Sequence, residues 1–204
     1  MRANLAISAA AVAVSWIAPP LHAQDAEAAR VAAQVCASCH GQRGESISPA
    51  FPKIGGQSTE YLETQLKAFR DRTRADPMAQ AYMWGMTSQL SDGMIKQLAA
   101  YYGSQKPPHG KAADPKVASA GRTIYESGIP AAKVQACIAC HGKDAVGNGA
   151  FPRLAGQHAE YLVKQLVLFK SSQREGGNAA IMHAISTGMS FEQMQSVAAY
   201  LASR

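Results

Sequence analysis

The chain has 204 residues, of which 47% are hydrophobic and 17% are charged. This composition is typical of one or two globular domains and excludes a disordered or collagen-like chain. The formal net charge is +6 at pH 7, but no long run of basic residues occurs, so we do not expect an arm that binds nucleic acid.

The N-terminal segment predicts a secretory signal peptide. Arg2 supplies a positive charge, Leu5–Ile17 is an apolar stretch, and Ala23 offers a small residue at a cleavage site. The stretch is too short to span a bilayer as a stable helix, although an uncleaved N-terminal anchor is the alternative. We therefore expect residues 1–23 to be removed. The mature chain would have no transmembrane segment and would be exported, most simply to a bacterial periplasm.

The remainder of the chain consists of two copies of one domain-sized unit. Ten of the twenty positions in Phe51–Arg70 are identical to their counterparts in Phe151–Lys170. Agreement over so long a segment favours duplication of a domain of about 80–90 residues. We assign residues 24–105 to a first domain and residues 117–204 to a second. The segment between them, residues 106–116, is rich in proline and predicts an extended linker.

The local sequence pattern within each copy is helical. In the first copy we expect helices near residues 26–39, 59–73, 78–87 and 92–104. In the second copy, Ser190 followed by Gln193 predicts a capping box at the start of the last helix. Segments 41–57 and 142–157 are rich in Gly and Pro and predict loops. Strand-like alternation is absent, so the predicted fold class is all-α.

Two CxxCH motifs use all four cysteines of the chain: Cys36, Cys39 and His40, then Cys137, Cys140 and His141. Two thiols at this spacing can form thioethers with the vinyl groups of one porphyrin, and the next residue offers an imidazole to the iron. A zinc site made of four thiols would leave both histidines unexplained. A thioredoxin-like site would need a βαβ pattern, which is missing. We therefore predict two covalently bound haem c groups.

Methionines are the candidates for the second axial ligand of each iron. Met83 and Met182 each stand eight residues before the serine expected to cap the last helix of their copy. None of the histidines outside the motifs repeats in this way. A single methionine is by default core filler, but the repeat favours ligation, which raises the haem potential and closes the iron to substrates. Met78, Met86 and Met189 are the alternatives.

These elements make nearly all of the mature chain resemble the cytochrome c4 family of diheme class I cytochromes c. The resemblance rests on both CxxCH motifs, both FP(K/R)(I/L)xGQ segments with the following YLxxQL helix, and both distal methionines. It implies two cytochrome c domains related by a pseudo-twofold axis, with the haem propionate edges near each other. It also implies that the carbonyls of Pro52 and Pro152 accept Nδ1–H of His40 and His141, leaving each Nε2 for iron. Met189 departs from the family, which tends to have leucine there.

The resemblance implies periplasmic electron transfer, commonly from a quinol-oxidising complex toward terminal oxidases. Such transfer is outer-sphere and needs no proton donor, nucleophile or substrate pocket, so we expect an electron carrier and not an enzyme. The expected partners are redox proteins, including peripheral contact with membrane complexes. The diheme subunit of a sulfide-oxidising flavocytochrome is the main alternative. A haem enzyme would need an open iron or an unusual ligand such as cysteine, and no cysteine is left over.

Gln57 and Gln157 also repeat, in the FP(K/R)(I/L)xGQ segments. Each could cap the helix that follows it or bind a haem propionate. The sequence does not choose between these two roles.

Overall fold

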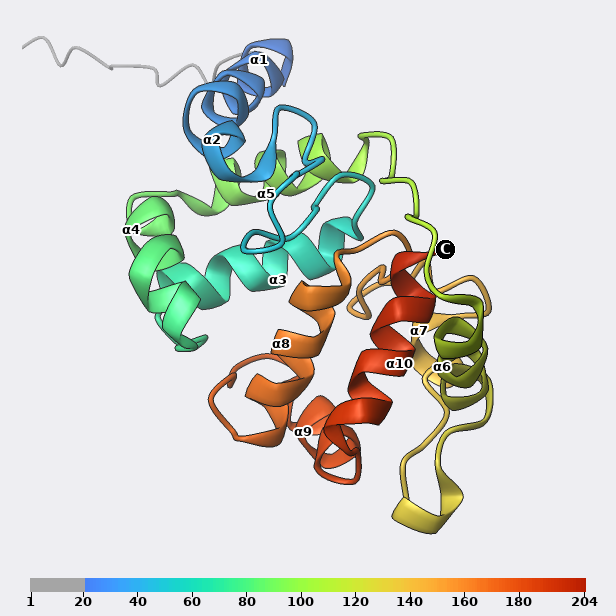
Figure 1. Ribbon diagram of the computed structural model, residues 1–204. Helices are drawn as coiled ribbons and strands as arrows, with labels where there is room; N and C mark the ends of the chain where they lie inside the picture. The colour runs from blue at the N-terminus through green and yellow to red at the C-terminus, as the bar shows by residue number, and fades with distance from the viewer. Residues whose placement is uncertain (1–20) are drawn as a thin grey trace, which may run out of the picture.

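The computed structural model describes residues 21–204 (Figure 1). The predicted signal peptide up to residue 20 therefore lies outside the described residues. Within them the chain is helical, and the only β pairings are the isolated bridges Ile129–Val134 and Asn148–Phe151. The predicted all-α class is confirmed. No helix in the described part is long and apolar enough to cross a membrane.

The first domain has the four predicted helical segments. Helix α1 (Leu21–Val31) runs through the π-helical turn η1 (Ala32–Cys36) into α2 (Ala37–His40), followed by α3 (Thr59–Arg70), the π-helical turn η2 (Ala79–Met83) with α4 (Trp84–Thr87), and α5 (Asp92–Gly103). Helix α3 ends three residues earlier than predicted. The cause is a turn at Arg72, whose φ of 57° is left-handed and cannot continue the helix.

The second domain repeats this order with one longer connection. Its helices are α6 (Pro115–Ser127), the 3₁₀ turn η3 (Pro130–Ala132), α7 (Ile138–His141), α8 (Ala159–Lys170), α9 (Ala179–Thr187) and α10 (Phe191–Ala202). The predicted capping box of Ser190 and Gln193 is present at the start of α10. Helix α8 ends as α3 does, in a left-handed turn at Ser172.

The predicted extended linker is wrong for its last two residues. Pro115 is the first residue of α6, and Asp114 caps that helix by accepting the backbone N–H of Lys116 and Val117. Proline is tolerated at this position because the first helical N–H has no partner within the helix. Earlier in the linker, the backbone N–H of Lys111 donates to Ala202 O at 2.9 Å, so the linker is attached to the end of α10.

Each domain has its own hydrophobic core, in which the first and last helices pack against each other: α1 on α5, and α6 on α10. Small residues allow the close approach. Ala28 in α1 and Ala32 at the start of η1 are both buried. In α6, a Cβ added at Gly121 would lie 1.9 Å from Ser196 O, so only glycine fits there.

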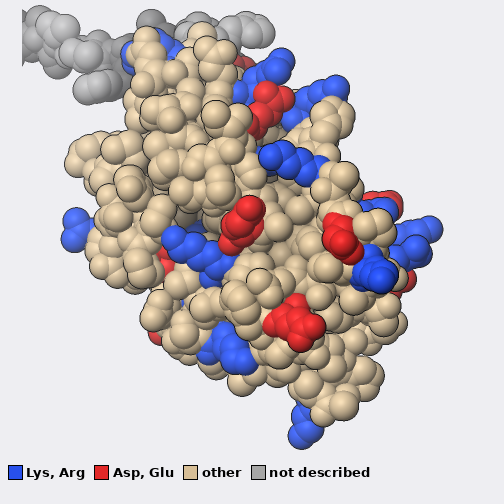
Figure 2. Space-filling model, viewed as in Figure 1, with Lys and Arg blue, Asp and Glu red and all other residues tan. Residues whose placement is uncertain are grey.

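The two domains lie one above the other in Figure 1, with α3 and α8 near the boundary between them. The C-terminus also lies close to this boundary. The face shown in Figure 2 is mostly uncharged, with Lys, Arg, Asp and Glu scattered over it and no patch of a single sign.

Candidate haem sites and the domain seam

Both CxxCH motifs lie on short helical turns. Cys36 ends η1, and Cys39 and His40 follow on α2, whereas Cys137 precedes α7 directly. All four cysteines are half-buried, and none of them is in a disulfide. Burial raises the pKa of Cys137 to about 11, and it also raises the pKa of Cys36. These sites favour uncharged sulfur, and a thioether is uncharged.

The two motif histidines share one geometry. Nδ1 of His40 lies 2.9 Å from Pro52 O, and Nδ1 of His141 lies 3.0 Å from Pro152 O. Both imidazoles are buried, and burial lowers their pKa although the carbonyl acceptor raises it. A neutral ring that donates from Nδ1 keeps a lone pair on Nε2, the atom that an iron needs. The structure thus contains both hydrogen bonds that the resemblance implies.

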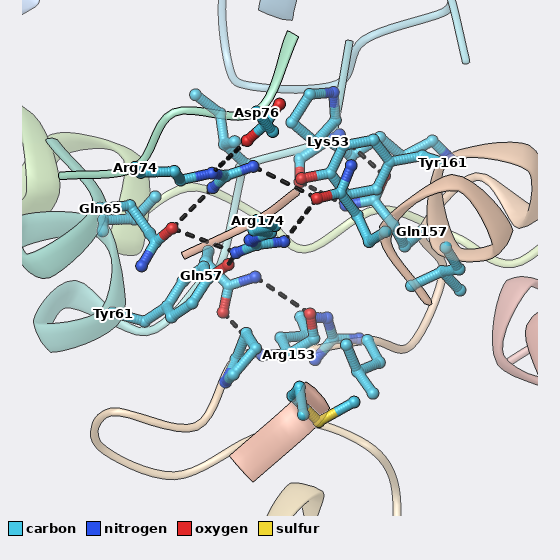
Figure 3. Close-up of a pocket in the computed structure, with 18 of the residues that line it drawn as sticks. Lys53, Gln57, Tyr61, Gln65, Arg74, Asp76, Arg153, Gln157, Tyr161 and Arg174 are labelled. Carbon is cyan, nitrogen blue, oxygen red and sulfur yellow. Dashed lines mark hydrogen bonds and ion pairs between the residues drawn. The ribbon is translucent and has the colours of Figure 1, made fainter. Parts of the chain in front are cut away.

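One continuous cavity of about 620 Å³ runs through both domains and is lined by both CxxCH motifs. Its walls beside the motifs are apolar, formed by side chains such as Leu62, Leu98, Leu162 and Leu201. Where the two domains meet, the lining becomes polar (Figure 3). A haem is a flat apolar ring with two carboxylates on one edge. A cavity with two apolar ends and a polar middle therefore fits two haems.

All five methionines considered above line this cavity, but they are not equivalent. Met86 is 57% exposed, and Met189 is 2% exposed within the core of the second domain. Met83 and Met182 are partly buried in the cavity wall. Met83 is the last residue of the π-helical turn η2, a type of turn that is frequent at functional sites. This placement favours Met83 over Met86, and Met182 over Met189.

Gln57 and Gln157 reach across the boundary between the domains. Gln57 accepts Arg153 N–H at 2.6 Å and donates to Arg153 O at 3.0 Å. Gln157 accepts Lys53 N–H at 2.9 Å and donates to Lys53 O at 2.8 Å. We call the contact made by these four residues the domain seam. Since partners on the two sides differ by 100 in number, the seam has the predicted pseudo-twofold relation.

The two roles expected for these glutamines did not include a contact between the domains. Each side-chain oxygen does accept the N–H of the next residue, Ser58 or His158, just before the following helix. The remaining bonds go to the backbone of the other domain. Sequence alone could not show this, because the partner segments are about a hundred residues away.

Position 58 and its counterpart 158 also bridge the domains, although their residue types differ. Ser58 Oγ donates to Gly149 O. His158 Nε2–H donates to Ser46 O at 2.8 Å, and Ser46 Oγ in turn donates to the carbonyl of Cys39 at 3.0 Å. The sequence alone does not pair these two positions, because serine and histidine do not match. The equal spacing of 100 was the only available signal.

These features define the class of protein as a c-type cytochrome with two domains, and comparison with known proteins agrees. The cytochrome c family matches residues 26–106 and again residues 118–204. Cytochrome c4 from Azotobacter vinelandii is 38% identical over 187 residues, covering 88% of this chain and 89% of that protein.

A solved cytochrome c4 structure from Acidithiobacillus ferrooxidans is 38% identical with a TM-score of 0.78, covering 83% of this chain and 98% of that chain. A protein named thiosulfate dehydrogenase electron acceptor, from Thiomonas intermedia, is 37% identical over 213 residues, covering 100% of this chain and 92% of that protein. The chain belongs to the cytochrome c4 family. It is a diheme electron carrier with two covalently bound haem c groups.

Proposed function

We propose that the mature chain is a periplasmic shuttle that passes single electrons between respiratory redox partners through two His/Met-ligated haems. The observation that carries this proposal is the matched pair of sites, each with a carbonyl-bound histidine and a methionine in the wall of one shared cavity. We place the first domain at residues 24–105 and the second at residues 117–204. Residues 106–116 join them, and the last two of these residues already belong to α6.

The proposed roles of the site residues follow their positions. Cys36, Cys39, Cys137 and Cys140 form the thioethers; His40 and Met83 bind the first iron; His141 and Met182 bind the second. Pro52 and Pro152 position the two histidines by holding Nδ1–H. When bound, each haem supplies a one-electron iron couple.

The protein's own residues account for outer-sphere transfer without substrate chemistry. The His–Pro hydrogen bonds fix the ring orientation in both oxidation states, so that little reorganises when an electron arrives. A methionine that binds the iron together with the histidine would leave no open position for a substrate. Both sites open into the same cavity, so the two haems would share one interior space, which favours electron exchange between them.

The upstream and downstream partners are proposed to be a quinol-oxidising complex and a terminal oxidase. The test is to mix oxidised holo-protein with such a complex and quinol, and to follow haem reduction by stopped-flow absorbance. Rapid reduction of both haems, followed by reoxidation on adding oxidase, supports the proposal. Failure of either reaction contradicts that partner assignment.

A second candidate donor is suggested by the relative named as an electron acceptor of thiosulfate dehydrogenase, which spans the whole of this chain. The same stopped-flow experiment with thiosulfate dehydrogenase and thiosulfate tests this donor directly. Faster reduction by that enzyme than by the quinol-oxidising complex would make thiosulfate oxidation the source of electrons. Stable co-purification with a flavoprotein would instead support the flavocytochrome alternative.

Export is tested separately. N-terminal sequencing of the protein from a periplasmic fraction should find residue 24, or one within a few positions of it, at the start of the mature chain. Recovery of the protein with Met1 intact would contradict cleavage.

A further inference from the structure

Two buried arginines, Arg74 and Arg174, occupy the polar middle of the cavity, one from each domain (Figure 3). They are 6% and 7% exposed. The left-handed turns at Arg72 and Ser172 bring the chain back under α3 and α8, so that Arg74 N–H donates to Ala68 O and Arg174 N–H to Leu168 O. The fold thus holds both side chains at matching positions.

Each guanidinium stacks on a phenylalanine of its own domain. The Arg74 guanidinium carbon lies 4.6 Å from the centre of the Phe69 ring, and that of Arg174 lies 4.5 Å from the centre of the Phe169 ring. A cation over an aromatic face is held in orientation as well as stabilised. The N–H groups lie in the plane of each guanidinium, so the stacking leaves them available as hydrogen-bond donors.

The two arginines share their hydrogen-bond acceptors across the domain boundary. Gln65 Oε1 accepts from Arg74 at 2.6 Å and from Arg174 at 3.1 Å. Gln165 Oε1 accepts from Arg174 at 2.6 Å and from Arg74 at 3.3 Å. Arg174 also donates to the Tyr61 hydroxyl at 2.9 Å. Two positively charged guanidiniums therefore lie close together in the protein interior, and the acceptors that they share are uncharged.

The negative charge near these arginines is incomplete. Asp76, which is 1% exposed, accepts Arg74 Nε–H at 2.8 Å. The counterpart of Asp76 is Gly176, so Arg174 has no carboxylate partner among the residues that the structure describes. Burial would raise the pKa of the nearby Tyr61 phenol, but the Arg174 and Arg74 charges outweigh it and hold that pKa below its ordinary value.

A third arginine that lines the same cavity also lacks a partner for part of its guanidinium. Nε of Arg153 is buried and has no hydrogen-bond partner in the described part of the chain. Burial lowers the pKa of Arg153. Arg74, Arg153 and Arg174 thus line the cavity together with a single carboxylate, that of Asp76, among the described residues that line it. Buried charges without partners are costly, which indicates that anions complete the site.

We propose that Arg74 and Arg174 form one anion-binding seat, shared by both domains, that receives propionate carboxylates from both haems and raises both reduction potentials together. The inference rests on the proposed attachment of the haems at the apolar ends of the cavity. That placement leaves the polar middle for the carboxylate edges. Positive charge beside a haem favours the reduced iron, because reduction removes one positive charge. The negative charge of Asp76 partly offsets the positive charge of the two arginines.

The test is a spectroelectrochemical titration of the holo-protein with three variants. Arg174→Gln removes positive charge and should lower both haem potentials. Asp76→Asn removes negative charge and should raise them. The control is Arg122→Gln on α6, where the guanidinium is exposed and pairs with Glu126 at 2.8 Å; it should leave both potentials unchanged.

The opposite signs expected for the two shifts in potential distinguish an effect of charge from a loosening of the structure. Arg174→Gln and Asp76→Asn both break hydrogen bonds of the same cluster, so structural loosening would shift the potentials in one direction in both variants. Arg174→Lys restores the charge without the forked geometry and should return the potentials toward the wild-type values. If Arg174→Gln does not mature, the rise in Asp76→Asn still tests the seat.

Haem potentials that do not change, or that change in the same direction in both variants, would overturn the proposal that the two arginines form this anion-binding seat. A shift confined to one haem would overturn its sharing between domains. The methionine–iron absorption band of the wild-type protein reports the proposed axial ligands independently. Loss of that band would contradict the ligand assignment, whereas the signs of the shifts test the seat in either case.

Discussion

Met83 and Met86 stand three residues apart, and their exposure separates them. Met86 is 57% exposed, whereas Met83 is partly buried in the cavity wall at the end of η2. We expect Met83→Leu to remove about half of the methionine–iron charge-transfer absorbance, since one of two haems loses its ligand. The potential of that haem should also fall, because the thioether favours reduced iron.

Met86→Leu is the matched control and should leave both the absorbance and the potentials unchanged. The measurement is the visible spectrum of the oxidised protein, followed by a redox titration. The reverse result, with Met86→Leu abolishing the band, would make Met86 the ligand.

His158, which donates to Ser46 O of the other domain, should make the stability of the protein depend on pH. Burial lowers its pKa, outweighing the Ser46 carbonyl, which raises it; Lys53 and Lys111 lower it further and Glu160 raises it. The unfolded chain therefore binds more protons near the ordinary pKa of histidine, so stability is complete above that pH and is lost as the pH falls through it. We expect the free energy of unfolding to decrease between about pH 7 and pH 5.

His158→Gln, which retains a donor but does not titrate, should weaken that decrease. His109→Gln, at an exposed position in the linker, should not. Guanidinium denaturation of the holo-protein at both pH values measures the difference. Equal pH dependence in the wild type and in His158→Gln would contradict a role for this group.

Residues whose chemistry is local were predictable from the sequence. The CxxCH spacing alone predicts that Cys36 and Cys39 attach a haem and that His40 binds its iron, without any knowledge of the fold. Arg74 and Arg174 were not predicted, because the segments around them diverge between the copies and their partners come from both domains. Their role depends on the seam, which no local pattern encodes.

At the scale of the helices, the contact of α6 with α10 is the most restrictive. A Cβ at Gly121 would meet Ser196 O at 1.9 Å, whereas a Cβ at Gly85 in α4 would meet nothing within 4 Å. We expect Gly121→Ala to lower the free energy of unfolding by about 2 kcal/mol or more, because backbone must move. Gly85→Ala should be neutral or stabilising by up to about 1 kcal/mol, because alanine favours helix.

Chemical denaturation of the two holo-proteins checks this pair. If Gly121→Ala were as stable as Gly85→Ala, the close packing of α6 on α10 would be wrong.

Helix positions were predicted well and their fine geometry was not. Apolar spacing predicted the segment near 59–73, and serine capping predicted the starts of the helices at 92–104 and of α10. The π-helical turns η1 and η2 were missed, because a pattern of one turn cannot distinguish 3.6 residues per turn from a wider turn. The start of α6 was missed because Pro115 was read as extended backbone.

For the whole molecule, the seam should make the two domains depend on each other. Gln157→Ala removes two hydrogen bonds to Lys53, so the backbone N–H and carbonyl of Lys53 lose these partners. We expect a loss of about 1–3 kcal/mol in the free energy of unfolding. The exposed Gln173→Ala is the control, with little change expected. An undiminished stability of Gln157→Ala in guanidinium would show that the seam contributes nothing.

The chain is proposed to bind the iron of each of its two haems through one histidine and one methionine. The most direct test is a redox titration of the purified holo-protein followed by visible absorption. We predict two low-spin haems per chain, a methionine–iron charge-transfer band in the oxidised form, and no binding of carbon monoxide or cyanide without mutation. A high-spin haem, or ready binding of either ligand, would show an open iron and contradict the assignment of that domain as an electron carrier.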